Sequence, residues 1–354
     1  MFYVSCSEKG GDQNNFGAPF CSKKAIFVKD MSNVLNITPQ TKLSDIVAAK
    51  PSLLSVLERL NIKLGFGDAS VLDICNQYGF SLPLFTNICA IYSGKRVDLQ
   101  EPLGKEDLLH LIDYLQTSHK YYSKQLLPAI HNKIHQLAKN GDASNSRIIN
   151  KFYDDYDIEL ANHFNFEENI VFPYTRQLLE NGSSRAFGKG VKIEQFEQNH
   201  TNIEEKLADL KNILLKYLPP EYSNAIRFKL LSDISLLETD LLHHTAIEDM
   251  LLVPSLTILK NNGVKPSSLA NYKRNTKHQN QQEEQLSQRE KEILAAVAQG
   301  KTNKEIAGQF NLSVFTVTTH RKNISKKTGI NSISGLTVYA IINKLIEINS
   351  LQNS

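Results

Sequence analysis

Long amphipathic stretches occupy the middle of the chain, from residue 104 to residue 260. Apolar residues recur there at intervals of three and four, as in LLHLIDYLQ and FKLLSDISLLETDLL, which is typical of helices with one buried face. Turn sequences separate the stretches: NGD at 140–142, NGSS at 181–184 and PP at 219–220. Four helices with short connections predict an up-down bundle.

The pattern differs on both sides of this bundle. Short helical patterns broken by glycine and proline predict a small helical domain over 36–100, after a non-periodic polar leader over 1–35. Residues 261–285 are polar with almost no apolar content and predict a linker. Helical periodicity returns over 286–350, so the whole chain is predicted to be all-α.

Six histidine and glutamate residues of the bundle follow an internal repeat. Each half carries a histidine and, 44 residues later, a His-x3-Glu-x5-Pro motif. Equivalent positions of the two halves are all 81 residues apart. The six are His119, His163 and Glu167 in the first half, and His200, His244 and Glu248 in the second.

This spacing predicts a two-metal site. Residues four apart lie on one helix face, so each motif presents an imidazole and a carboxylate toward one point, and the two carboxylates can bridge two metals. Imidazole and carboxylate ligands without thiolates favour iron or manganese over a structural zinc ion. A single histidine on an apolar helix face is usually a hydrogen-bonded core residue, but six positions at one offset favour metal ligands.

Other polar residues of the bundle are weaker candidates. Glu159 and Asp240, also 81 residues apart, lie one turn before His163 and His244 and could orient a ligand or be ordinary solvated positions. Glu204, one turn after His200, is a possible additional ligand. The remaining bundle histidines are interpreted as surface or core residues: His110, His131, His135 and His243.

The stretches HFNFEENIVFP, QNH and HHTAIEDMLLVP resemble the hemerythrin-like family, and within it proteins that repair iron–sulfur centres. The resemblance implies two iron ions, with manganese less favoured, in a non-haem di-iron centre bridged by an oxo or hydroxo group and by Glu167 and Glu248. Oxygen-carrying hemerythrins have a further histidine near the position of Glu204, which favours the repair type here.

Residues 41–92 resemble the N-terminal domain of the same repair proteins. In that family a pair of cysteines follows the segment that matches LNIK, whereas Leu64 and Gly65 stand there in this sequence. Thiol chemistry is therefore not expected in this domain. Cys75 is predicted to be a small buried apolar residue.

The C-terminal block has the helix boundaries of a helix-turn-helix domain. Ser287 and Glu290 form a capping box at the start of one helix, and a second short helix begins at Asn303. After a turn, Ser313 caps a third helix that ends near Lys327. A short helix, a tight turn and a longer helix are the elements of a helix-turn-helix motif.

The charge of this block favours DNA. Residues 286–328 contain eight basic and three acidic residues, a net charge of +5, although a basic solvated helix without nucleic acid remains the alternative. LSQREKEILAAVAQGKTNKEIAGQFNLSVFTVTTHRKNISKKTGI resembles the LuxR-type helix-turn-helix domain, which implies double-stranded DNA as a partner and a homodimer. The predicted DNA contacts are Lys304, Thr316, Thr318, Thr319, Arg321, Lys322, Lys326 and Lys327.

The overall composition adds few constraints. Four cysteines without a recurring spacing predict neither a zinc ribbon nor a disulfide framework, and a cytoplasmic protein without a membrane span is expected. The features together predict a transcription regulator that senses oxygen, nitric oxide or redox stress through a di-iron centre. The alternative is an iron–sulfur repair or nitric-oxide-reducing enzyme with an accessory DNA-binding domain. The helix-turn-helix domain disfavours a storage protein.

Overall fold

The computed structural model describes residues 37–139, 142–181, 193–260 and 285–347. These residues form helices and no strand, which confirms the all-α prediction. The predicted leader and all but the last residue of the predicted linker lie outside the described residues.

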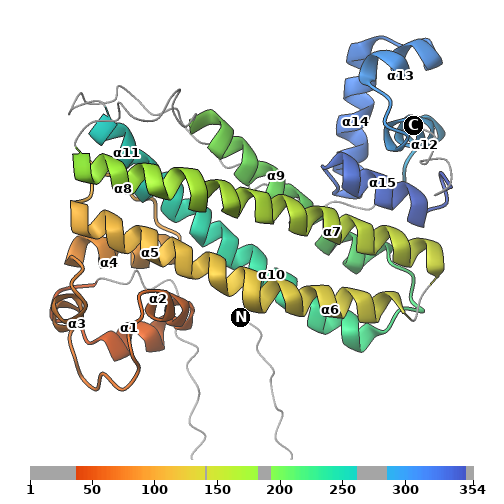
Figure 1. Ribbon diagram of the computed structural model, residues 1–354. Coiled ribbons are helices and arrows are strands. Elements are labelled where there is room, and N and C mark those ends of the chain that lie inside the picture. Colours follow the sequence, from red (N-terminus) through yellow and green to blue (C-terminus); the bar gives the residue numbers. More distant parts are fainter. Residues whose placement is uncertain (1–36, 140–141, 182–192, 261–284, 348–354) are drawn as a thin grey trace, which may run out of the picture. The chain divides into compact units, whose positions relative to one another are not determined.

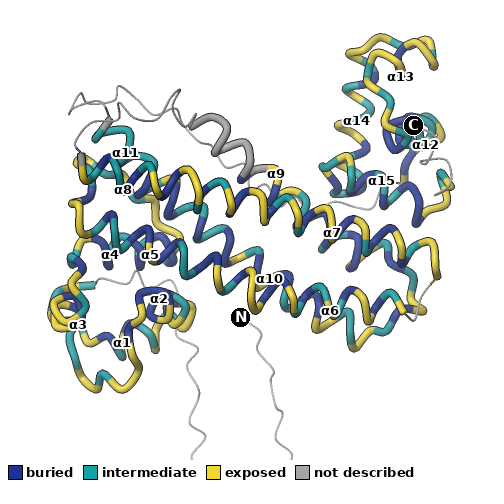
Figure 2. Tube along the Cα trace, in the orientation of Figure 1, coloured by how far each residue is buried: buried dark blue, intermediate teal, exposed yellow. Residues whose placement is uncertain are grey.

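Four long helical segments form the bundle (Figure 1). Three of them contain a π-helical turn between two α-helices, and one ends in such a turn. The segments are α5 (Lys105–Tyr121), η2 (Tyr122–Leu126) and α6 (Leu127–Ala138); α7 (Ala143–Phe166), η3 (Glu167–Val171) and α8 (Phe172–Asn181); α9 (Ile193–Asn212) and η4 (Ile213–Tyr217); and α10 (Asn224–Ile247), η5 (Glu248–Leu252) and α11 (Val253–Lys260). Their buried faces point inward, as the dark blue positions in Figure 2 show.

Proline positions explain where the π-helical turns occur. A proline lies six residues after the first residue of each turn, at 128, 173, 219 and 254. Proline lacks an N–H group and its ring collides with the carbonyl four residues earlier, so an α-helix must widen or break there. The wider bonding is visible at Leu218, whose N–H donates to the carbonyl of Ile213 at 2.9 Å. Two of the turns begin at Glu167 and Glu248.

The N-terminal helical module packs on α5 and α10. It consists of α1 (Leu43–Ala49), the 3-10 turn η1 (Pro51–Leu53), α2 (Leu54–Arg59), α3 (Val71–Tyr78) and α4 (Leu82–Tyr92). A buried ion pair links it to the bundle, because Arg59 donates to both carboxylate oxygens of Asp240, one of them at 2.9 Å. The hydroxyl of Tyr92 also accepts a hydrogen bond from Arg59 at 2.8 Å.

The cysteines of this module are buried. Cys75 is 2% exposed and Cys89 is fully buried. Burial raises the pKa of the Cys75 thiol to about 11 and that of Cys89 to about 12. A thiol that stays protonated is a poor nucleophile, so the prediction of a small buried residue at Cys75 is confirmed.

The described residues of the C-terminal domain form four helices, of which the first three begin where the sequence predicts. They are α12 (Gln288–Ala298), α13 (Asn303–Phe310), α14 (Val314–Thr328) and α15 (Ile333–Ile342). The capping box of Ser287 and Glu290 is present, and the hydroxyl of Ser313 accepts from Thr316 N–H at 3.0 Å. Asn311 ends α13 in the left-handed conformation, at φ 52°, which makes the tight turn before α14.

Candidate metal centre and nucleic-acid interface

The six predicted ligands lie together in the middle of the bundle, and all four helical segments contribute. Each of the six side chains is at most 6% exposed, and the two glutamates are fully buried. Glu167 and Glu248 are the first residues of η3 and η5, so each carboxylate leaves its helix where the backbone widens. The residues on α-helices are His119 on α5, His163 on α7, His200 on α9 and His244 on α10.

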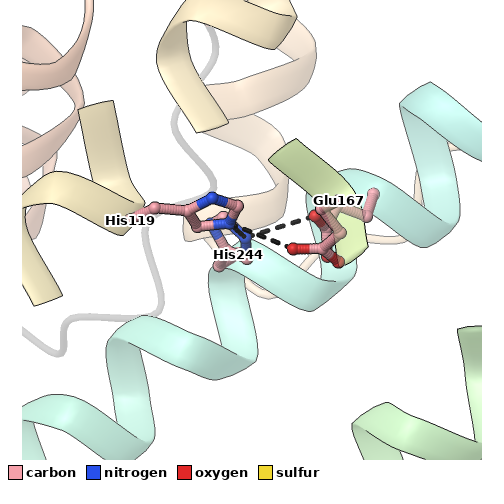
Figure 3. A group of neighbouring side chains, drawn as sticks. His119, Glu167 and His244 are labelled. Carbon is pink, nitrogen blue, oxygen red and sulfur yellow. Dashed lines mark hydrogen bonds and ion pairs between the residues drawn. The ribbon is translucent and has the colours of Figure 1, made fainter. Parts of the chain in front are cut away.

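The six side chains form two groups that share both glutamates. One group holds His119 and His244, the other His163 and His200, and the possible ligand atoms of each group lie within 4.8 Å of one another. Figure 3 shows the first group, with the rings of His119 and His244 facing the carboxylate of Glu167. Each group takes one histidine from each half of the 81-residue repeat.

Each carboxylate faces both groups. One oxygen of Glu167 lies 3.1 Å from His119 Nε2, and its other oxygen lies 3.1 Å from His163 Nε2. The oxygens of Glu248 lie 3.2 Å from His200 Nε2 and 3.2 Å from His244 Nε2. This is the arrangement in which a carboxylate can bridge two metals.

The donor atoms fit a pair of cations. The four carboxylate oxygens of Glu167 and Glu248 are buried and accept no hydrogen bond from the described residues. Two buried anions so placed are costly unless positive charge lies between them. The Nε2 atoms of His119 and His244 are 3.1 Å apart and both face this region. Nitrogen and oxygen donors without sulfur suit iron or manganese.

The charges around the site favour ionised carboxylates. Burial alone would raise the pKa of Glu248, but His244 and His200 lower it well below its ordinary value. Burial also lowers the pKa of His119, yet Glu167 and Glu168 outweigh it and raise that pKa to about 9. The carboxylates are therefore anionic, and a metal that binds His119 would displace a proton from its ring.

A second pair of carboxylates supports the histidines from outside. Glu168 lies 2.9 Å from His119 Nδ1, and Asp249 lies 3.5 Å from His200 Nδ1. Holding Nδ1 directs Nε2 toward the centre of the site. Sequence reasoning missed this pair, although the two residues are also 81 apart and directly follow Glu167 and Glu248.

The residues predicted for this supporting role make other contacts. Glu159 forms an ion pair with Lys206, and Asp240 forms the buried pair with Arg59. Glu204 is half-buried on α9 and belongs to neither group of ligand atoms.

The predicted DNA contacts divide by exposure. Lys304, Thr319, Lys322 and Lys326 are exposed on α13 and α14. Thr316, Thr318, Arg321 and Lys327 are half-buried. Arg321 donates to Asn303 at 2.7 Å and Lys327 donates to Glu290 at 3.0 Å, so these two cations also hold the domain together. Sequence reasoning did not single out Phe315, which is 81% exposed in the first turn of α14.

Comparison with known families assigns two parts of the chain. Residues 110–256 match the hemerythrin HHE cation binding domain, and residues 284–340 match the luxR family of bacterial regulatory proteins. The chain thus joins a hemerythrin domain to a LuxR-type DNA-binding domain. Both assignments agree with the resemblances in the sequence.

Relatives share short segments with this chain. It is 45% identical over 56 residues to the transcriptional regulatory protein MctR of Rhizobium johnstonii, covering 16% of this chain and 26% of that protein. It is 47% identical over 62 residues to the oxygen regulatory protein NreC of Staphylococcus aureus, covering 18% and 29%. The matched segments thus span less than a third of either relative's length. No described helix is long and apolar enough to cross a membrane.

The α9–η4 segment of the hemerythrin domain contacts the LuxR-type domain where α14 ends and α15 begins. Asp209 of α9 is fully buried and accepts from the backbone N–H groups of Asn331 and Ser332, at 3.0 and 2.7 Å. Asn212 donates to the carbonyl of Gly329 at 2.8 Å, and Tyr217 donates to that of Thr328 at 2.6 Å. One segment therefore satisfies polar groups at the end of one helix and the start of the next.

Proposed function

We propose that this protein is a DNA-binding transcription regulator whose hemerythrin domain senses oxygen, nitric oxide or redox stress through two iron ions. The observation that carries the proposal is the double role of α9. This helix places His200 in the buried ligand cluster and, nine residues later, places Asp209 against the DNA-binding domain.

The six buried histidine and glutamate residues would form the sensor. His119 and His244 would hold one iron ion, His163 and His200 the other, and Glu167 and Glu248 would bridge them. When bound, such a pair supplies one-electron redox chemistry and coordination positions for a small oxidant or diatomic gas. Glu168 and Asp249 keep the His119 and His200 rings oriented, so a change in the required ligand geometry is transmitted to α5 and α9.

The contacts of α9 and η4 with the LuxR-type domain would transmit the change at the metal site. An α-helix is stiff over the nine residues from His200 to Asp209, so a shift or rotation at one end moves the other. Asp209, Asn212 and Tyr217 would then lose or gain their hydrogen bonds to the α14–α15 turn. Because α14 contains most of the predicted DNA contacts, its position and the geometry of a LuxR-type dimer on DNA would change with the state of the metal site.

An iron–sulfur repair or nitric-oxide-reducing activity is the second candidate. The resemblance of residues 41–92 to the N-terminal domain of repair proteins favours it. The buried, unreactive Cys75 and Cys89 favour the regulator.

The test compares DNA affinity in three states of the full-length protein: iron-loaded, metal-free and nitric-oxide-treated. The regulator predicts different affinities for its own promoter in at least two states. Equal binding in all three, together with reductant-driven nitric oxide turnover faster than that of free iron, would establish the enzyme instead. Glu167→Ala is the matched variant for loss of metal, and Glu159→Ala, on the same helical segment but outside the cluster, is its control.

A further inference from the structure

We propose that His131, His135 and Asp154 form a second metal site, at the surface of the bundle, that binds one divalent transition-metal ion of the zinc class. None of the three belongs to the buried cluster, so this inference stands independently of the di-iron proposal. The sequence alone predicts ordinary surface or core residues at both histidines. The spacing of the two histidines does not show that the neighbouring helix adds the carboxylate of Asp154.

The fold brings the three donors together from two helices. His131 and His135 lie one turn apart on α6, and Asp154 lies on α7, which packs along α6 (Figure 1). Tyr153, next to Asp154, donates a hydrogen bond to the carbonyl of Leu127 at 3.0 Å. That bond fixes α7 against α6 one turn before His131.

The distances match the edges of a coordination sphere. The Nε2 atoms of His131 and His135 are 2.9 Å apart, and His131 Nε2 is 3.5 Å from an oxygen of Asp154. Donors about 2.1 Å from a common ion are separated by about 3.0 Å in an octahedron and about 3.4 Å in a tetrahedron. All three donor atoms lie within 4.8 Å of one another.

The chemistry of the cluster favours a cation. Two Nε2 atoms that face each other can share only one proton, and neutral imidazole is the form that binds metals. A second carboxylate, Asp157, lies one turn after Asp154 on α7. Burial raises the pKa of Asp157, Asp154 raises it further, and His131 lowers it. Asp157 therefore lies close enough to Asp154 and His131 to interact electrostatically with both.

The donor set also defines the class of metal. Two imidazoles and one carboxylate suit zinc and its first-row neighbours rather than magnesium or calcium, which prefer oxygen alone. His131 is 41% exposed and Asp154 is 50% exposed, so the site is open to solvent and water can complete the coordination sphere.

The experiment is a zinc titration of full-length, iron-loaded protein against a competing chelating dye. The expected result is one zinc ion per chain beyond the iron, with a dissociation constant raised about 10- to 100-fold by His135→Asn or Asp154→Asn. Cobalt(II), added instead of zinc, should give d–d absorption in the wild type that is lost in both variants.

Two controls make the test specific. Asp155→Asn changes the neighbouring carboxylate, which pairs with Lys151, and should leave zinc binding unchanged. His320→Asn removes a histidine of α14 outside the cluster and should also leave it unchanged. If no additional zinc binds, or if it binds equally well to His135→Asn and the wild type, the site does not exist.

Discussion

Asp209 accepts hydrogen bonds from both the backbone N–H and the hydroxyl of Ser332, at 2.7 and 2.5 Å, although the two residues are 123 positions apart. A buried carboxylate of the hemerythrin domain thereby stabilises the first turn of α15 in the LuxR-type domain. Burial raises the pKa of this carboxyl, and the hydrogen bonds from Ser332 and Asn331 offset part of that effect.

Removing this contact should uncouple the two domains. Asp209→Ala leaves the backbone N–H groups of Asn331 and Ser332 without their acceptor, and hydrogen bonds to a charged group contribute about 1.5–3 kcal/mol each. A double-mutant cycle of Asp209→Ala and Ser332→Ala, measured by urea unfolding, should show a coupling energy of about 1–3 kcal/mol. The Asp209→Ala protein should also bind promoter DNA equally well with and without iron. Because Ser332→Ala removes only the hydroxyl, additive effects on stability would contradict the bond between this hydroxyl and Asp209.

A substitution at Gly335, which packs closely against Asp209, tests the same contact. A Cβ atom on Gly335 would lie 2.7 Å from an Asp209 oxygen and 2.7 Å from Ile330 Cγ2. Alanine normally stabilises a helix by about 1 kcal/mol over glycine. Here Gly335→Ala should instead lower the free energy of unfolding by about 1–3 kcal/mol, because Asp209 has to move. Gly308→Ala, in α13 with open space around its Cβ, is the control and should not be destabilising.

The carboxylates of Glu168 and Asp249, which face the Nδ1 atoms of two ligand histidines, should raise the affinity of the site for metal. Glu168→Gln and Asp249→Asn weaken the hold on His119 Nδ1 and His200 Nδ1, so each should lower iron affinity about 10- to 100-fold while the fold persists. Metal content after equilibration with a chelator measures this. Glu159→Gln, whose carboxylate pairs with Lys206, should retain its iron. Equal iron loss in all three variants would place the supporting role elsewhere.

The sequence predicted the bundle and the gathering of the six buried residues well, because helix periodicity and an 81-residue repeat can both be counted along the chain. The same offset connects Glu168 with Asp249, so the sequence could have predicted this pair. Three features could not be predicted. The π-helical turns depend on how a proline is accommodated within a continuing helix, and a 3.6-residue periodicity does not distinguish a wider turn. The Asp209–Ser332 and Arg59–Asp240 pairs join distant segments, and the repeat that singles out Asp240 does not indicate its partner Arg59.

The buried pair between Arg59 and Asp240 should be needed for stability. Arg59 is 3% exposed, so Arg59→Ala would leave the carboxylate of Asp240 buried without its counter-charge. Breaking one side of a buried pair costs about 3–5 kcal/mol. Urea unfolding should show this loss, and the double variant Arg59→Met, Asp240→Leu should recover most of it. Arg96→Ala, which removes an exposed pair with Asp98, should change stability by less than about 1 kcal/mol.

The pH dependence of the LuxR-type domain should report on Glu290. Burial would raise the pKa of this carboxyl, but the N–H of Ser287 and the ammonium of Lys327 lower it below its ordinary value of 4.5. A lowered folded-state pKa means that the ionised group adds stability above pH 4.5, and that this contribution disappears as pH falls through the folded-state value. Glu290→Gln should therefore be about 1 kcal/mol less stable than the wild type at pH 7. Unfolding curves of both metal-free proteins, measured stepwise from pH 7 to about pH 3, should converge at the acid end. A difference that stays constant over this range would show that the charge of Glu290 does not hold α12 and Lys327 in place.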